Sequence, residues 1–154
     1  MTDATPQSQL GAKVRKIVHD DLPWVADVCA HAYPGRVKDW DGFYAWWKQA
    51  VSNPNLLCIR TDIAFLVSAL HRFFYDPSLV LGTAVYFASE QTAPWDMVAL
   101  VRTGARWAVD AGALEYEVDA TTGIDPKPLA ARIGNLTERS VYRIGLNHVR
   151  QQHS

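Results

Sequence analysis

Residues 94–120, PWDMVALVRTGARWAVDAGALEYEVDA, carry the clearest structural pattern in the chain. Pro94 suits the first turn of a helix, where its missing N–H is not needed. Gly112 stands where a left-handed residue ends a helix. From Leu114 to Ala120 apolar and acidic residues alternate, as in a half-buried strand. The stretch predicts a long helix followed directly by a strand. The expected apolar stripe of the helix is Val98, Val101, Ala105, Ala108 and Val109.

The segments on either side complete an alternating set of strands and helices. Before residue 94, strands are expected at residues 14–18, 56–60, 64–70 and 80–88, with helices from Asp20 or Asp21 to Pro34 and at 39–51. After residue 120, helical segments are expected from about 126 to 134 and from 135 to 144, with a last strand at 146–151. Gly82 is a possible bulge, and residues 64–70 are apolar enough for burial on both faces. The order β-α-α-β-β-β-α-β-α-β predicts an α/β fold of the α+β kind, with helices on both faces of a mixed sheet.

Length and composition indicate one folded domain. The 154 residues, 49% of them hydrophobic, predict a single domain at 13–154. Residues 1–12 are polar and rich in Gln, Ser and Thr, so a disordered tail is expected there. The net charge of −1 argues against a dedicated nucleic-acid binder. A secretory signal and a membrane-length apolar run are not visible, so a cytoplasmic, reduced protein is expected. Cys29 and Cys58, in apolar surroundings, are expected to be buried structural thiols.

Three local motifs resemble the GNAT N-acetyltransferase superfamily over roughly residues 13–150. Residues 14–25 look like its first strand and helix, and residues 106–113 look like the end of its central helix. The best match is the segment from Asn135 to Leu146, which resembles the signature N-x-x-A-x-x-L-Y-x-x-L-G-F. Residues 71–74 and 122–125 resemble segments of small phage-encoded members.

The resemblance implies a GNAT-like fold and transfer of an acetyl group from acetyl-CoA to an amine of a small molecule or a protein. In this superfamily a splayed strand holds the pantetheine arm, and a loop at the next helix N-terminus holds the pyrophosphate. The implied cofactor-binding residues are Tyr86, Phe87, Ala88, Ser89, Gln91, Thr92 and Asn135. Tyr142 matches the tyrosine that protonates the leaving thiolate. Glu90, Glu117 and Asp119 are candidates for the general base, because they lie at or near strand ends.

The loop departs from the superfamily pattern Q/R-x-x-G-x-G/A. Gln91 is in register, but Pro94 and Asp96 replace both glycines. Proline removes a backbone donor, and at an effective dielectric near 20 a carboxylate about 4 Å from a phosphate charge costs about 4 kcal/mol. Acetyl-CoA binding is therefore expected to be weakened unless the carboxylate turns away.

Other interpretations of the same residues remain open. Tyr142 could simply pack on the sheet, and the acidic residues of 114–120 could form a solvated strand face. Trp40 to Trp47 could pack a helix on the core or line an acceptor site. The five histidines show no metal-binding arrangement.

Two alternative functions are also open. One is a catalytically inactive GNAT-fold binding or virion-associated protein, whose short C-terminal sheet edge could be completed by another subunit. The other is a GNAT-like enzyme of nucleic-acid modification, which the net charge disfavours.

Overall fold

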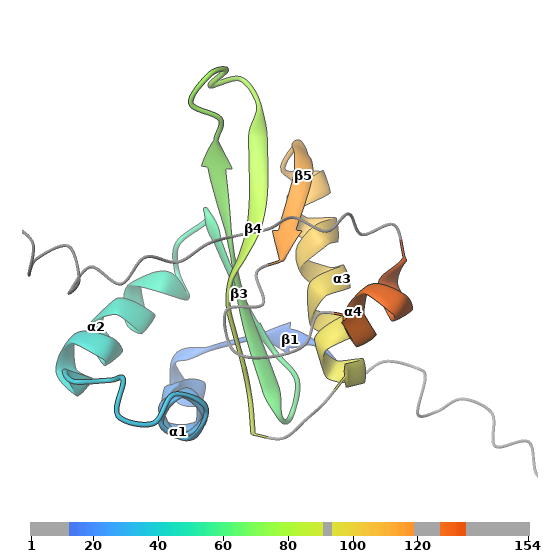
Figure 1. Cartoon of the computed structure of the whole chain (residues 1–154). Helices are drawn as coiled ribbons and strands as arrows, with labels where there is room; N and C mark the ends of the chain where they lie inside the picture. The colour runs from blue at the N-terminus through green and yellow to red at the C-terminus, as the bar shows by residue number, and fades with distance from the viewer. Residues whose placement is uncertain (1–12, 91–93, 119–126, 135–154) are drawn as a thin grey trace, which may run out of the picture.

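The computed structural model describes residues 13–90, 94–118 and 127–134. Its elements follow the order expected from the sequence (Figure 1). They are β1 (Arg15–Lys16), the 3-10 turn η1 (His19–Asp21), α1 (Leu22–Ala32), α2 (Trp40–Ala50), β2 (Leu56–Arg60), β3 (Ala64–Arg72), β4 (Val80–Ser89), α3 (Pro94–Asp110), β5 (Ala113–Val118) and α4 (Lys127–Ile133). The helix and strand expected after residue 134, and the tail at 1–12, lie outside the described residues.

The five strands form one mixed sheet in the order β1-β2-β3-β4-β5. Neighbouring strands are antiparallel except β4 and β5, which run parallel. A parallel pair needs a crossover connection, and α3 supplies it between β4 and β5. The mixed α/β architecture predicted from the sequence is confirmed.

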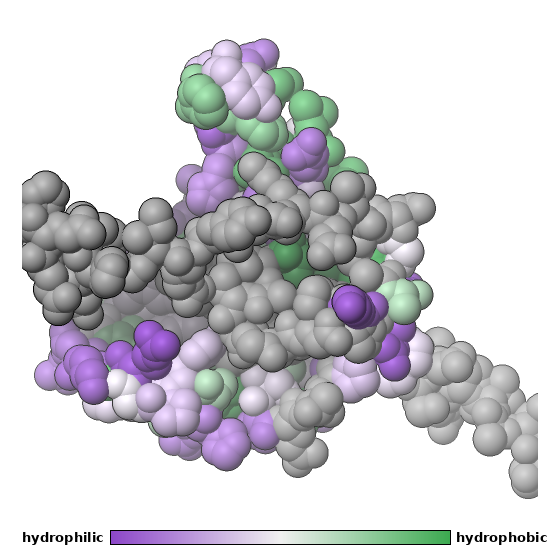
Figure 2. Space-filling view, viewed as in Figure 1, coloured by the Kyte–Doolittle hydropathy of each residue, from purple (hydrophilic) through white to green (hydrophobic). Residues whose placement is uncertain are grey.

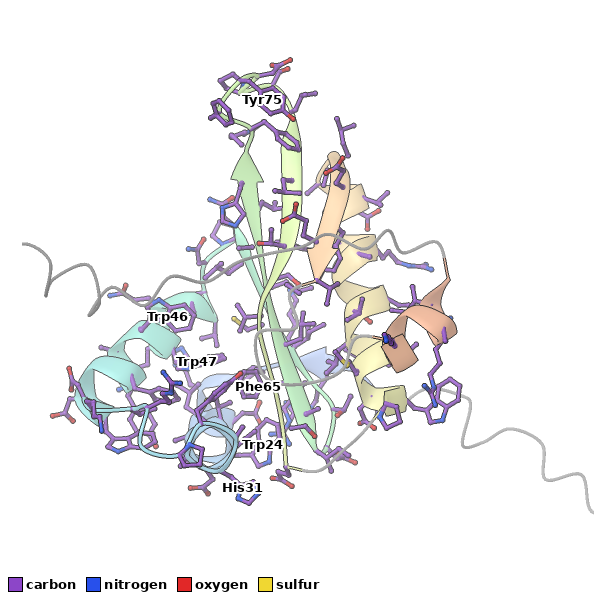
Figure 3. All side chains as sticks on the ribbon, in the orientation of Figure 1. Trp24, His31, Trp46, Trp47, Phe65 and Tyr75 are labelled. Carbon is purple, nitrogen blue, oxygen red and sulfur yellow. The ribbon has the colours of Figure 1, made fainter. Side chains whose placement is uncertain are left out.

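Helices cover both faces of the sheet. α1 and α2 pack on one face, where Trp24 and Trp47 contact Phe65 of β3 with ring centroids 6.3 and 5.3 Å apart (Figure 3). α3 and α4 lie on the other face, where the core contains Leu66, Leu100 and their neighbours. Residues 64–69 of β3 are all buried, because they contact helices on both sides. This confirms the expectation that β3 is a doubly covered strand.

Local chemistry explains where the helices begin and end. Asp39 caps α2 by accepting a hydrogen bond from the Gly42 backbone N–H at 2.9 Å. Gly112 ends α3 with a φ of +83°, and Gly134 follows α4 with a φ of +70°. Both values lie in the left-handed region that glycine adopts without a steric penalty.

Four expectations about β3, β4, α3 and β5 are wrong in detail. β3 continues to His71 and Arg72, because these residues pair with the start of β4. Gly82 pairs regularly with Leu70, so it is not a bulge between β3 and β4. Val109 of the predicted apolar stripe is 68% exposed, and Leu114 of the predicted buried strand face is 65% exposed. Val109 lies in the last turn of α3, and Leu114 is an extra residue of β5 at the register shift between the pairs Val80–Ala113 and Leu81–Glu115.

Tyr116 joins three strands beneath α3. Its hydroxyl lies 2.5 Å from Oγ of Ser68, which is fully buried on β3. The tyrosine ring reaches Ser68 by passing over Gly82 of β4, where a Cβ atom would lie 2.9 Å from Cδ2 of the ring. Gly104 of α3 leaves room for the hydroxyl from above. Burial raises the pKa of Tyr116 to about 12, so its hydroxyl stays protonated at neutral pH.

We expect Gly104→Ala to lower the free energy of unfolding by about 1–3 kcal/mol. A glycine-to-alanine change inside a helix ordinarily stabilises it by about 1 kcal/mol. Here the new Cβ would contact the Tyr116 hydroxyl and lie 2.8 Å from Ser68 Oγ, both of which are held by packing and by their mutual hydrogen bond. Urea denaturation measures the change, with the exposed Arg106→Ala in the same helix as a control. A stabilised Gly104→Ala variant would show that α3 is not tightly packed against Tyr116 and Ser68.

Candidate active site

A bulge in β4 opens the sheet between β4 and β5. Val67 of β3 pairs with Tyr86, whereas the next residue, Ser68, pairs with Ala84. Val85 is therefore an extra residue in β4. A bulge bends its strand and increases the local twist.

β5 pairs with β4 only as far as the bulge. The parallel register runs from Val80 and Ala113 to Ala84 and Val118. Beyond it, β4 continues to Ser89 alongside β3 alone within the described part of the chain, and Figure 1 shows β5 ending beside the middle of β4. Half of the backbone groups of a strand point toward each neighbouring strand. Among the described strands, residues 85–89 thus have β3 as their one neighbour, and we call their other edge, with its backbone donors and acceptors, the β4 opening.

The first turn of α3 follows shortly after the β4 opening. Pro94 begins the helix and Asp96 lies in its first turn, half-exposed. A carboxylate here stabilises the positive end of the helix dipole and disfavours a bound phosphate. Positive charge lies nearby on α4, because the Arg132 guanidinium is 5.1 Å from the centroid of the Trp95 ring. Arg102 of α3 donates a hydrogen bond to the Arg132 carbonyl at 3.2 Å.

Glu90, at the end of β4, is held by α1. The Trp24 indole N–H donates to Oε1 of Glu90 at 2.7 Å, and the Glu90 backbone N–H donates to the Ile63 carbonyl at 2.9 Å. Behind the indole, the Arg60 guanidinium lies 3.4 Å from the ring centroid. This stacking is a cation–π contact that fixes the plane of the indole. The Glu90 carboxylate is therefore oriented by a side chain that is itself restrained.

Asp21 completes this group of charged side chains. Its carboxylate accepts two hydrogen bonds from Arg15 at 2.7 Å, one from Arg60 at 3.0 Å and one from the Val18 backbone N–H at 2.9 Å. Hydrogen bonding to Arg15 is the largest cause of its low pKa, which is about 2. The ionised carboxylate offsets the desolvation cost of burying the Arg60 guanidinium near the start of α1.

We expect Asp21→Asn to destabilise the protein by about 2 kcal/mol at pH 7. A carboxyl pKa that falls from 3.8 to about 2 on folding contributes stability above pH 4 and loses it as the pH drops toward 2. The wild type should therefore lose stability between pH 4 and pH 2 more steeply than the variant, and their difference should shrink toward pH 2. Thermal unfolding from pH 2 to pH 7 measures both curves. Parallel curves would show that Asp21 is not coupled to folding.

The structure places the sequence-predicted site residues in two groups. The backbones of Tyr86, Phe87, Ala88 and Ser89 form the β4 opening, and Glu90 follows them. Glu117 lies on β5, where it pairs with Thr83 of β4. The other predicted residues lie outside the described part of the chain: Gln91, Thr92, Asp119, Asn135 and Tyr142. Sequence reasoning did not find the bulge at Val85 or the Tyr116–Ser68 bond, because both depend on pairing between strands.

Other candidate chemistry is limited in the described residues. Groups of three or more potential metal ligands are not found among them. Burial raises the pKa of both Cys29 and Cys58 to about 11, so these thiols stay protonated and unreactive, as a structural role requires. No helix within the described ranges is long and apolar enough to cross a membrane.

The mixed sheet and the helices on its two faces make up a GNAT fold. No sequence-family model matches the chain, and no curated protein matches it. Among solved structures, glucosamine-6-phosphate N-acetyltransferase from Arabidopsis thaliana has a TM-score of 0.69 at 10% identity, covering 86% of this chain and 96% of its own. The aminoglycoside 6'-N-acetyltransferase of Acinetobacter baumannii has a TM-score of 0.62 at 18% identity, with coverages of 86% and 97%. A transcriptional regulator from Bacillus halodurans C-125 has a TM-score of 0.69 at 12% identity, with coverages of 86% and 98%. Such identities establish the fold, whereas function depends on the site built on it.

Proposed function

We propose that this protein is an N-acyltransferase that moves an acetyl group from acetyl-CoA to an amine. The single observation that carries the proposal is the β4 opening, created by the bulge at Val85 and by the end of pairing at Ala84 and Val118. The pantetheine arm of acetyl-CoA contains two amides in an extended chain. An open strand edge binds such a chain by main-chain hydrogen bonds, in the manner of an added strand.

The described residues fit the two ends of acetyl-CoA unequally. Residues 85–89 supply the backbone groups that the pantetheine arm needs. At the first turn of α3, Pro94 withholds a donor and Asp96 adds a negative charge, while Arg132 and Arg102 lie close by on α4 and α3. The proposal therefore predicts a donor held mainly through its pantetheine arm and only weakly through its pyrophosphate.

The roles of the remaining residues belong to the same proposal. Tyr142 protonates the leaving thiolate, as the resemblance implies. Asp119, a candidate general base in the sequence, directly follows Val118, the last paired residue of β5. Glu90 lies five residues beyond Val85, about 16 Å along an extended strand. Its bond to Trp24 suits it to holding α1 against the end of β4 rather than to taking a proton at the start of the opening, near Val85.

A second candidate is a GNAT-fold protein that binds a partner without catalysis. Pro94 and Asp96 favour it, because they weaken the phosphate site. The tip of the β3–β4 hairpin also favours it: Phe74 is 95% exposed and Tyr75 is 65% exposed, and Figure 2 shows this tip standing clear of the rest of the surface. Failure of acetyl-CoA to bind would leave this candidate in place.

We expect Asp96→Asn to tighten acetyl-CoA binding about tenfold at low ionic strength, because it removes a half-exposed negative charge from the phosphate end of the site. Isothermal titration of the wild type and the variant measures the two dissociation constants. Asp110→Asn, at the other end of α3, is the matched control and should bind like the wild type. Equal affinity for the wild type and Asp96→Asn would mean that the pyrophosphate does not lie at this helix. Absence of acetyl-CoA binding by both proteins would reject the proposed function.

A further inference from the structure

Three polar side chains form a row across β3, β4 and β5. Nε2 of His71 lies 3.0 Å from Oγ1 of Thr83, between neighbouring strands. Thr83 is the register partner of Glu117 in the parallel pair of β4 and β5. Neighbouring strands lie about 4.8 Å apart, so Thr83 is within reach of both His71 and Glu117, which are themselves two strands apart.

This row lies on the sheet face that carries α1 and α2. Side chains alternate along a strand, so His71 shares the face of Phe65 and Val67, which pack against α1 and α2. Thr83 pairs with Ala69 on the same face. The two helices cover only the part of the face away from the hairpin tip (Figure 1). His71 is accordingly exposed and Thr83 is half-buried.

The row also borders the β4 opening. Thr83 comes two residues before the extra residue Val85, and Glu117 comes one residue before Val118, the last paired residue of β5. A thioester carbonyl at the start of the β4 opening would therefore be approached from this face. Thr83 is two residues, about 7 Å along the strand, from Val85, so an amine held beside Thr83 would lie between the row and that carbonyl.

We propose that His71, Thr83 and Glu117 form the acceptor site, with His71 as the group that takes the proton of the amine. This inference rests on the proposed function and names the residues that serve the acceptor. As the nitrogen–carbon bond forms, the neutral His71 imidazole accepts the proton of the amine nitrogen, either directly or through the Thr83 hydroxyl. The carbon–sulfur bond of the thioester breaks, and the departing thiolate takes a proton from the general acid proposed above, which regains one from solvent. The His71 imidazolium then returns its proton to solvent, so atoms and charge balance.

Glu117 defines the class of acceptor. Its carboxylate, together with that of Glu115 two residues earlier on the same face, gives this end of the row negative charge. Primary amines are ammonium ions at neutral pH, and a negative site concentrates them before one proton is lost. The site therefore suits amines without a carboxylate of their own, such as putrescine, tyramine or kanamycin, better than amino acids such as lysine.

The test measures acetyl-CoA binding, turnover and the imidazole NMR signals of His71 separately. His71→Gln and Thr83→Val are compared with wild type and with the matched control His31→Gln, an exposed histidine of α1 (Figure 3). Acetyl-CoA binding by titration should stay within twofold in every variant. Release of free thiol in the presence of putrescine, tyramine or kanamycin should fall about a hundredfold or more in His71→Gln, the usual effect of losing a general base, and should not change in His31→Gln. In the wild type, putrescine should shift the imidazole NMR signals of His71 and leave those of His31 in place.

Each other outcome overturns a definite part of the account. A wild type that does not bind acetyl-CoA rejects the proposed function and this inference with it. A wild type that binds acetyl-CoA but turns over none of the three amines, or His71→Gln at the wild-type rate, rejects the inference alone. Unchanged His71 signals at saturating putrescine reject it as well.

Discussion

Deletion of Val85 should weaken acetyl-CoA binding at least a hundredfold while the protein stays folded. The deletion removes the one residue of β4 that is in excess over β3. Ala84 and the residue now following it would keep their partners Ser68 and Val67, so the register on both sides of the site survives. Without the bulge β4 runs straight, and its edge can continue to pair with β5 instead of turning away.

The matched control for this deletion is Val85→Ala, which keeps the extra backbone residue. It should bind acetyl-CoA within about threefold of the wild type. Isothermal titration measures the affinities, and circular dichroism with thermal unfolding verifies that the deletion variant is folded. A folded deletion variant with wild-type affinity would show that the β4 opening does not hold the donor.

Phe65→Ala should reduce the free energy of unfolding by about 3–5 kcal/mol, the usual effect of emptying a large aromatic site in a core. Phe65 is 1% exposed, and it separates Trp24 of α1 from Trp47 of α2 (Figure 3). Its removal leaves both indoles without their shared contact and creates a cavity beneath two helices. The same substitution at Phe74, on the hairpin tip and 95% exposed, should change the free energy of unfolding by less than about 0.5 kcal/mol.

Urea denaturation of the two phenylalanine variants provides the comparison. Because both variants lose the same side chain, the difference between their free energies of unfolding reports the effect of burial. Equal effects at Phe65 and Phe74 would contradict the packing of α1 and α2 on this face of the sheet.

The fold could be predicted where the sequence pattern is local. β2 was expected at its observed bounds, and α3 begins at Pro94 and ends before Gly112 as expected. These elements depend on helical or alternating spacing and on glycine and proline, which act within a few residues. The extension of β3 to His71 and Arg72 was missed, because it depends on pairing with β4 rather than on the polar residues themselves.

The candidate site was predictable only in part for the same reason. That residues 86–89 hold the donor was implied by the resemblance and stays a prediction. The sequence placed the possible bulge at Gly82, whereas the structure has it at Val85. A bulge is a property of two strands in register, and neither strand alone reveals it. The Ser68–Tyr116 bond joins residues 48 positions apart, and His71 meets Thr83 only because the hairpin folds. Neither contact can be predicted from the pattern of one segment, because each joins residues of different strands.

Backbone hydrogen exchange with and without acetyl-CoA tests the central claim most directly. Saturating acetyl-CoA should slow exchange at residues 85–89, whose outer edge has no strand partner among the described residues, and should leave residues 80–84 unchanged, because they are already paired with β5. Slower exchange confined to 85–89 would place the donor in the β4 opening. Unchanged exchange at 85–89 in a protein that binds acetyl-CoA would contradict the account.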